Sequence, residues 1–418
     1  MIRRFAVTVA AAVGLLAGWA SSAAADVPHV NHVFIVVLEN EDAGDTFGDK
    51  TDIPYLANTL TGQGAFVKNY YATGHLSLDN YISMVSGQAP NPYTQADCPV
   101  YADVTPGVPV ADGQVLGSGC VYPAGVQNIA TQLEGNGYTW KGYMQDMANS
   151  APGKPASCRH PAIGAADDTQ QAKPTDQYAT RHNPFVYFHS IIDLPTCQAN
   201  DVDLNQLAPD LRSAATTPSY AFITPDLCND GHDEPCADGG LGGMKQANGF
   251  LKDVIPQIVR SPAYQDRGVI IVTFDEAEGG TSPSDDGSAC CGEPTGPNTS
   301  APGALTGGPG GGRVGAVMVS NCIQPATVST DPYNHYSLLR SVEDNFDLPH
   351  LGYAAQAGLQ PFGKDILNNP SCPRGATPCI PRAKHKKKHK RFAELSKHKK
   401  HKKHKKKCKK KKRKKGKH

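Results

Sequence analysis

The chain has 418 residues, and its 41 Lys and Arg nearly balance its 39 Asp and Glu. The balance hides a segregation, because residues 383–418 hold 22 basic residues and one acid, whereas residues 26–382 hold 17 basic and 38 acidic residues. A length of 418 residues is typical of two or three domains. The distribution of charge instead indicates two parts, an acidic body and a basic tail.

The first 25 residues have the pattern of a secretory signal peptide. Arg3 and Arg4 precede an apolar run from Phe5 to Ala20, and small residues lead to Asp26. This pattern is typical of an exported protein, and no later stretch is long and apolar enough to span a bilayer. We therefore expect a secreted chain without a transmembrane span after cleavage, which excludes the usual nuclear interpretation of a basic run.

Apolar runs of strand length recur through the body without polar alternation. In chain order, the expected strands are residues 33–38, 220–224, 269–274 and 314–319, and the expected helices are residues 80–85, 126–134, 244–258 and 336–346. Such strands are typical of a parallel sheet covered on both faces. The pattern predicts an α/β sandwich that occupies residues 26–382.

Three segments lack this periodicity. We interpret residues 97–217 as long insertions around the core, and residues 279–312, which end in a Gly-rich run, as a mobile loop. Residues 383–418 are rich in Lys and His and too poor in apolar residues to form a core, so we expect a disordered tail.

Twelve cysteines suit an oxidising compartment. Candidate pairs are Cys228 with Cys236, Cys372 with Cys379, and Cys98 with Cys120, although spacing does not fix connectivity. For adjacent Cys290 and Cys291 we favour two separate disulfides over part of a structural metal site, because no C-x-x-C or His pair accompanies them.

Polar residues follow three of the expected strands directly. Glu39 and Asn40 follow the first strand, Asp226 follows the second, and Asp275 and Glu276 follow the third. Ligands of parallel sheets bind at the carboxyl ends of the strands, and clustered carboxylates repel one another unless a cation neutralises them. This arrangement predicts a cation site at one edge of the sheet.

Ser77 stands where the next helix is expected to begin. A serine there is often only a helix cap, but a helix start also presents N–H groups and a positive dipole to an anion, which suits attack on a phosphate.

Together these segments resemble a known family. Glu39-Asn40, Ser77-x-x-Asn80-Tyr with Ser86-Gly87, Pro225-Asp226 with Gly231-His232-Asp233, Asp275-Glu276, and the run from Asn334 to Arg340 occur in the order seen in secreted phosphoesterases. That family includes bacterial acid phosphatases and phospholipases C, on an alkaline-phosphatase-like fold. One departure is Asp79, which stands where the family often has Pro.

The resemblance implies a role for each matching residue. Ser77 is the nucleophile, His232 and His335 are the other catalytic residues, and His75, Asn80 and Asp226 surround the phosphate. One metal is held by Glu39, Asn40, Asp275 and Glu276. Oxygen ligands favour a hard divalent cation such as Ca²⁺, Mg²⁺ or Mn²⁺ over zinc.

The resemblance favours an acid-phosphatase-type phosphomonoesterase that acts through a phosphoserine. Two alternatives stay open: a phospholipase C-type phosphodiesterase, and a non-catalytic protein that binds the cell envelope. We expect the tail to bind anionic surfaces, namely envelope polymer, lipid or nucleic acid, and thereby to retain the protein at the cell surface.

Overall fold

The fold is described from a computed structural model of the chain, and the account covers residues 27–49, 51–149 and 153–372. The expected signal peptide and basic tail both lie outside these residues. Within them, no helix is long and apolar enough to cross a membrane.

A central sheet forms the core of the described part. Its strands are β1 (His32–Leu38), β2 (Ala65–Val67), β6 (Trp140–Met144), β7 (Asp201–Asp203), β8 (Tyr220–Thr224), β9 (Gly268–Phe274), β10 (Ala316–Ser320) and β11 (Thr327–Ser329), in the spatial order β11-β2-β10-β9-β1-β8-β6-β7. Strands β9, β1, β8, β6 and β7 are parallel, and β10 runs antiparallel to β9 and β2. Every residue of β1, β8 and β9 is buried, as continuous apolar runs predict.

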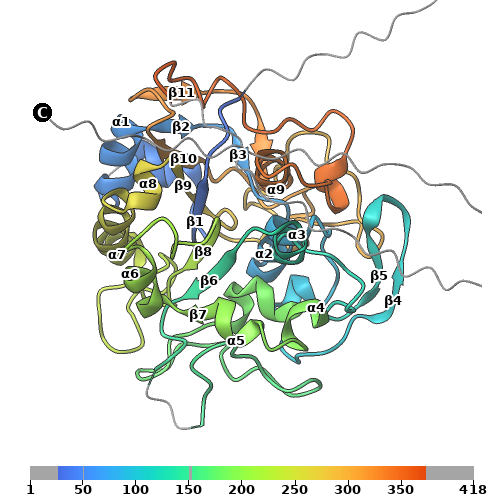
Figure 1. Cartoon of the computed structure of the whole chain (residues 1–418). Helices are drawn as coiled ribbons and strands as arrows, with labels where there is room; N and C mark the ends of the chain where they lie inside the picture. The colour runs from blue at the N-terminus through green and yellow to red at the C-terminus, as the bar shows by residue number, and fades with distance from the viewer. Residues whose placement is uncertain (1–26, 50, 150–152, 373–418) are drawn as a thin grey trace, which may run out of the picture. The chain divides into compact units, whose positions relative to one another are not determined.

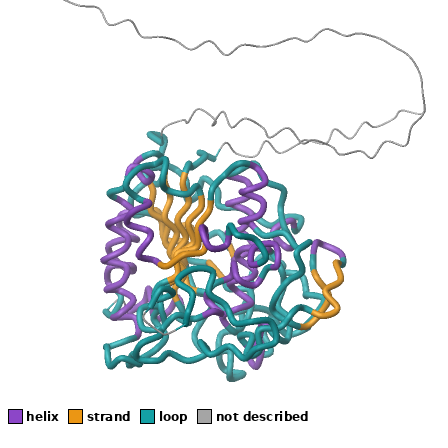
Figure 2. The backbone as a smooth tube through the Cα atoms, turned by 60° about the horizontal axis from the view of Figure 1, so that its bottom comes forward, coloured by secondary structure: helices purple, strands orange, loops and turns teal. Residues whose placement is uncertain are grey.

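Helices cover both faces of this sheet. They are α1 (Thr61–Gln63), α2 (Ser77–Ser86), α3 (Ile129–Asn136), α4 (His189–Ile192), α5 (Cys197–Asn200), α6 (Leu207–Asp210), α7 (Gly243–Val259), α8 (Pro262–Gln265) and α9 (His335–Asn345). Figure 1 shows α7 and α8 on one side of the strands and α2, α3 and α9 on the other, and Figure 2 shows the same layering after rotation. The expected α/β sandwich with a mostly parallel sheet is confirmed.

Two small sheets lie outside the central one. Strands β3 (Tyr70–Tyr71) and β12 (Tyr333–Asn334) pair in parallel, and β4 (Thr105–Pro109) and β5 (Val115–Ser118) form an antiparallel hairpin that projects at one side of Figure 1.

The segment 97–217 differs from the sequence interpretation. It supplies β6 and β7 to the central sheet, so it is part of the core and not only an insertion around it. These strands are short, and β6 contains a lysine and a glycine, so the sequence has no apolar run that identifies it as a strand. Its strand conformation depends instead on pairing with β8.

Five disulfides join described cysteines. The expected pairs Cys98–Cys120 and Cys228–Cys236 are confirmed, and Cys158 pairs with Cys197. Two expectations were wrong. Cys372 pairs with Cys322, not with Cys379, because the chain returns to the end of β10; and Cys290 bonds its neighbour Cys291, so the two do not enter separate disulfides.

Candidate active site

The site lies where β1 and β9 end. Leu38 and Phe274, the last residues of these strands, are paired neighbours, so Glu39 and Asn40 emerge beside Asp275 and Glu276. The residues Glu39, Asp275 and Glu276 are each no more than 2% exposed. Two of the three expected strand ends, those of β1 and β9, therefore lie side by side, whereas Asp226 after β8 hydrogen-bonds Asn229.

Ser77 faces this group from the first residue of α2. Its Oγ donates a 2.9 Å hydrogen bond to Oε2 of Glu39, and the hydroxyl of Tyr81, one turn further along the helix, donates a 2.9 Å bond to Oε1. The helix begins here because Leu76 is extended, and it ends at Gly87, whose φ of 68° lies in the left-handed region. The N–H of Leu78 donates to Oδ1 of Asp97 at 3.0 Å, so a carboxylate already complements the helix dipole beside Ser77.

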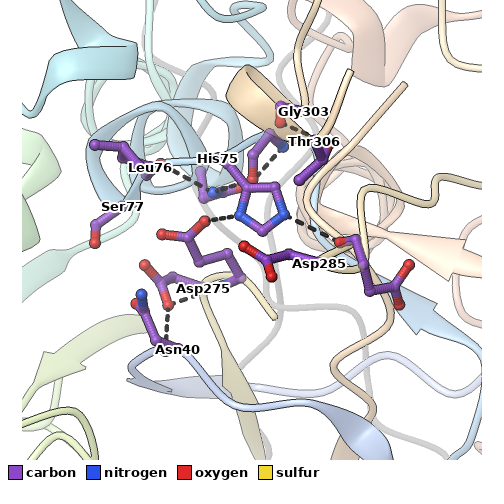
Figure 3. A network of polar contacts seen from close by, with 12 residues as sticks. Asn40, His75, Leu76, Ser77, Asp275, Asp285, Gly303 and Thr306 are labelled. Atoms are coloured by element: carbon purple, nitrogen blue, oxygen red, sulfur yellow. Dashed lines mark hydrogen bonds and ion pairs between the residues drawn. The ribbon is translucent and has the colours of Figure 1, made fainter. Parts of the chain in front are cut away.

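Asn40 and Asp275 lie against each other. The Asn40 N–H donates to Oδ1 of Asp275 at 3.1 Å (Figure 3), and the backbone of Asn40 is left-handed with φ 42°. Their remaining oxygens, Oδ1 of Asn40 and Oδ2 of Asp275, are buried and have no hydrogen-bond partner. Buried acceptors without a donor are costly, and a cation would satisfy both.

Burial and mutual repulsion control the charge of these acids. Burial raises the pKa of Asp275 to about 6, and it holds the pKa values of Glu39 and Glu276 well above the usual range. Asp275 repels both glutamates and raises their pKa values further. Asn40 and Asp275 supply two unpartnered buried oxygens, which suit a hard divalent cation, whereas the carboxylates of Glu39, Asp275 and Glu276 do not all have an oxygen within 4.8 Å of one another.

A separate acidic group lies nearby in the chain but is more exposed. The carboxylates of Asp42, Asp45 and Glu278 have oxygens within 4.8 Å of one another. Exposed acidic groups are common without a bound ion, so we assign no cation to this outer group.

His75 lies on the same edge, behind Glu276. Its Nδ1 contacts Oε2 of Glu276, and its Nε2 contacts the carbonyl of Asp286 at 3.0 Å. Figure 3 shows Ser77, His75, Asn40 and Asp275 gathered around one region. Because Glu276 and a backbone carbonyl occupy both ring nitrogens, His75 positions Glu276 and does not offer a free donor to a phosphate.

The segment 279–312, expected to be a mobile loop, contacts His75 and Gln95. It has no strand and only a short 3₁₀ turn at Ala304–Thr306. The carbonyl of Pro302 accepts the N–H of His75 at 3.0 Å, and that of Ala301 accepts from Gln95 at 2.9 Å. The loop therefore covers the chain just before the nucleophile, whereas its mobility stays a prediction.

Two predicted phosphate ligands are engaged in their own turns. Oδ1 of Asn80 accepts the N–H groups of Thr73 and Gly74 at 2.9 and 3.0 Å, and its amide donates to the carbonyl of Gly74 at 2.8 Å. Oδ1 of Asp226 accepts the N–H of Asn229 at 3.0 Å and its side-chain amide at 2.8 Å. Both side chains thus hydrogen-bond groups of their own turns, and their phosphate-binding roles stay predictions.

His335 is also placed behind the site. It is fully buried at the start of α9, where Nε2 lies 2.6 Å from the carbonyl of Asp275 and Nδ1 lies 3.0 Å from the hydroxyl of Tyr70. Burial lowers its pKa to about 4. With both nitrogens occupied, His335 holds Asp275 in position and is poorly placed to protonate a leaving group.

His232 is the histidine that reaches the surface. Its side chain is 51% exposed, and Nδ1 lies 3.0 Å from Oδ1 of Asp233. That hydrogen bond raises the pKa of His232, whereas burial opposes the rise. Among the predicted histidines it is the one with a ring nitrogen left for a substrate.

Two residues at the site were missed from the sequence. Nε2 of His182 lies 3.1 Å from Oε1 of Glu39, and its Nδ1 lies 3.7 Å from Oδ2 of the fully buried Asp230. The His182 ring stacks on Tyr81 with 5.3 Å between centroids. In the loop after β8, the carboxylate that lies beside His182 is therefore that of Asp230, whereas the sequence pattern predicted Asp226 at the site.

Comparison with known proteins identifies the family of the chain. A model of the Phosphoesterase family matches residues 49–349. The chain is 25% identical over 322 residues to a probable acid phosphatase of Kluyveromyces lactis, covering 76% of this chain and 59% of that protein. It is 25% identical over 361 residues to the phosphatidylinositol-3-phosphatase of Mycobacterium tuberculosis, covering 85% and 92%.

Solved structures show distant likeness. One is a protein of the alkaline phosphatase superfamily from Vibrio parahaemolyticus, at TM-score 0.43 and 12% identity, covering 77% of this chain and 69% of that one. Another is a phosphonate monoester hydrolase from Silicibacter pomeroyi, at TM-score 0.44 and 12% identity, covering 82% and 78%.

Since the family match spans well over half of the chain, the protein belongs to the Phosphoesterase family. The chain spans between 44% and 59% of the length of the fungal acid phosphatases that it matches, with 59% for that of Kluyveromyces lactis and 44% for that of Aspergillus niger.

Proposed function

We propose that the protein is a metal-dependent phosphomonoesterase of the acid phosphatase type, with Ser77 as the nucleophile. The hydrogen bond from Ser77 to Glu39 carries this proposal, because it places a helix-start hydroxyl against the acids that follow β1 and β9. A phosphate ester is attacked only where its negative charge is neutralised, so a serine aimed into a cation site is the arrangement that the reaction needs.

The residues divide the reaction between them. Ser77 gives its proton to Glu39, with which it is hydrogen-bonded, and its Oγ attacks phosphorus, so that the alcohol oxygen leaves and a phosphoserine forms. Water then attacks the phosphoserine and releases phosphate; the proton on Glu39 returns to Ser77 Oγ, and a proton of the attacking water recharges His232. Glu39 and Tyr81 orient the serine, and His232 supplies the proton that the departing alkoxide takes up. A divalent cation held by Glu39, Asn40, Asp275 and Glu276 would neutralise phosphate charge and favour the serine alkoxide.

The choice between monoester and diester is tested directly by turnover. The full-length protein with added Mg²⁺, Mn²⁺ or Ca²⁺ is expected to hydrolyse p-nitrophenyl phosphate faster than bis(p-nitrophenyl) phosphate. Phosphatidylinositol 3-phosphate belongs in the same panel, since a relative named for that activity is matched over 92% of its length. Faster turnover of the diester would favour the phospholipase C alternative, and no turnover of any ester would favour the binding protein.

The remaining proposals concern location and rest on the sequence. Residues 1–25 direct export, and the 22 basic residues of 383–418 tether the exported protein to anionic surfaces. Retention on vesicles that contain anionic lipid should weaken steeply with salt, because exposed charges are screened over about 8 Å at physiological ionic strength. A chain that lacks residues 383–418 and binds the vesicles equally well would refute the tether.

A further inference from the structure

A cavity of about 400 Å³ opens beside the site, between two segments that lie far apart in the sequence. One wall comes from residues 170–181 and the other from residues 227–237. The second wall is closed on itself by the Cys228–Cys236 disulfide, so it is held in a fixed shape. Pre-formed concave sites of this size are typical of small-molecule binding.

Each wall is connected to the nucleophile through one residue. Arg181 lines the first wall, and its neighbour His182 lies 3.1 Å from the Glu39 carboxylate that accepts the Ser77 hydroxyl. His232 lines the second wall, and its N–H donates to Asp230 at 3.0 Å. Each wall therefore adjoins a residue of the site, and the cavity includes the histidine that we assign as proton donor.

The lining is polar and of mixed charge. Six of the ten lining residues are polar or charged, namely Arg181, His232, Asp233, Glu234 and two glutamines, and the other four are Ala172, Leu227, Pro235 and Ala237. Arg181 Nη1 makes only long bonds, of 3.4 and 3.2 Å, to the carbonyls of Thr169 and Gln170, and no described residue accepts from Nη2. The guanidinium thus keeps donor capacity beyond these two bonds.

We propose that this cavity binds the leaving alcohol of the substrate and selects a polyol, such as a sugar or cyclitol, over an aryl or alkyl alcohol. The proposal rests on the phosphatase function above and names its substrate class. Hydroxyl groups both donate and accept, so they match a wall that carries cations, carboxylates and amides together. An apolar alcohol would leave these groups desolvated without partners, and sites that hydrogen-bond a hydroxyl reject analogues that lack it.

An anionic leaving group fits less well. Asp233 and Glu234 line the same wall as His232, and Asp97 lies 3.7 Å from the Arg181 Nε, so both cations already face carboxylates. A second phosphate or a carboxylate would meet repulsion from these acids. A neutral polyol avoids it.

The test compares substrates with the same phosphoryl group. For each ester, kcat/KM is divided by the rate constant of its uncatalysed hydrolysis, because the aryl ester is intrinsically more reactive. For the wild-type protein this ratio is expected to be about tenfold or more higher for myo-inositol 1-phosphate than for p-nitrophenyl phosphate. Fluorophosphate, whose leaving group is too small to reach the cavity, serves as the internal reference.

Variants then fill or depolarise the cavity. Ala172→Trp and Gln171→Leu should lower kcat/KM for the inositol ester about tenfold and leave that for fluorophosphate within twofold. Ala215→Trp, an exposed alanine outside the cavity, is the matched control. Thermal melting confirms that each variant folds.

The outcomes separate the two proposals. Wild-type turnover of every ester at rates that neither variant changes would overturn the cavity inference and leave the phosphatase function standing. If the wild-type protein turned over no ester, the function would fail; saturation-transfer NMR with free myo-inositol would then decide the cavity, with binding that Ala172→Trp abolishes supporting it and no binding overturning it.

Discussion

The hydroxyl of Ser77 donates a 2.9 Å hydrogen bond to Oε2 of Glu39, which joins the first residue of α2 to the residue that follows β1. The other oxygen of Glu39 is held by Tyr81 and lies 3.1 Å from His182. The serine is therefore oriented by a carboxylate that is itself held by Tyr81 of the same helix and by His182 of the turn Thr180–His182, and Glu39 links the nucleophile to the proposed cation site.

Replacing the nucleophile tests its role in turnover. Ser77→Ala should lower kcat for p-nitrophenyl phosphate by roughly 10³ or more, because a covalent route is lost, and it should leave the melting temperature close to that of the wild type. Ser213→Ala, in the turn after α6, is the matched control. Activity within tenfold of the wild type in folded Ser77→Ala would contradict the assignment.

The cation site predicts stabilisation by metal. Adding Mg²⁺, Mn²⁺ or Ca²⁺ should raise the melting temperature of the wild type, since a ligand at one hundred times its Kd adds about 2.7 kcal/mol to the free energy of unfolding. Asp275→Asn keeps the Oδ1 acceptor for Asn40 but removes the charge, so the metal-induced shift should nearly vanish.

Asp45→Asn, in the outer acidic group, is the control for that experiment and should keep the full shift. Equal shifts in Asp275→Asn and in the wild type would place the cation elsewhere.

The loop after β8 offers a paired comparison. Asp230→Asn should lower kcat/KM about tenfold or more, because Oδ2 of Asp230 faces His182 and its Oδ1 holds the backbone of His232. Asp226→Asn should instead lower thermal stability and leave kcat near the wild-type value, since its Oδ1 serves its own turn. A larger loss of kcat in Asp226→Asn than in Asp230→Asn would support the phosphate-binding role that the family resemblance implies for Asp226.

Glu343 predicts a pH dependence of stability away from the site. It is fully buried in α9, and burial raises its pKa to about 9 from the model-compound value of 4.5. Between these values the folded protein keeps a proton that the unfolded chain releases, so the free energy of unfolding falls as pH rises through this window.

Glu343→Gln removes that titration. The variant should gain stability relative to the wild type as pH rises from about 5 to about 8, by at most about 1.4 kcal/mol per pH unit. Chemical denaturation at several pH values measures the difference, with Asp347→Asn as an exposed control. Parallel stability curves for Glu343→Gln and the wild type would show that the glutamate is ionised in the fold.

The sequence predicted the frame of the site because that frame depends on local pattern. Apolar runs identify β1, β8 and β9, and the residues after them must emerge at one edge of a parallel sheet. Glu39, Asp275 and Ser77 follow from this rule together with a helix start.

The second layer of residues depends on tertiary folding and could not be predicted in this way. Asp226 and Asp230 both follow β8, and only the path of the loop decides which carboxylate meets His182. His182 itself lies in an aperiodic segment. Asn80 and His335 match the family pattern, but the turn at Thr73 and the hydroxyl of Tyr70 occupy their side chains.

The central claim is that Ser77 carries the phosphoryl group during turnover. Wild-type protein mixed with a phosphate monoester and quenched in acid within one turnover should contain phosphoserine at Ser77 by peptide mass spectrometry, and Ser77→Ala should contain none. Rapid hydrolysis with no phosphorylated Ser77 at any time within the first turnover, or with the phosphoryl group on another residue, would contradict the account.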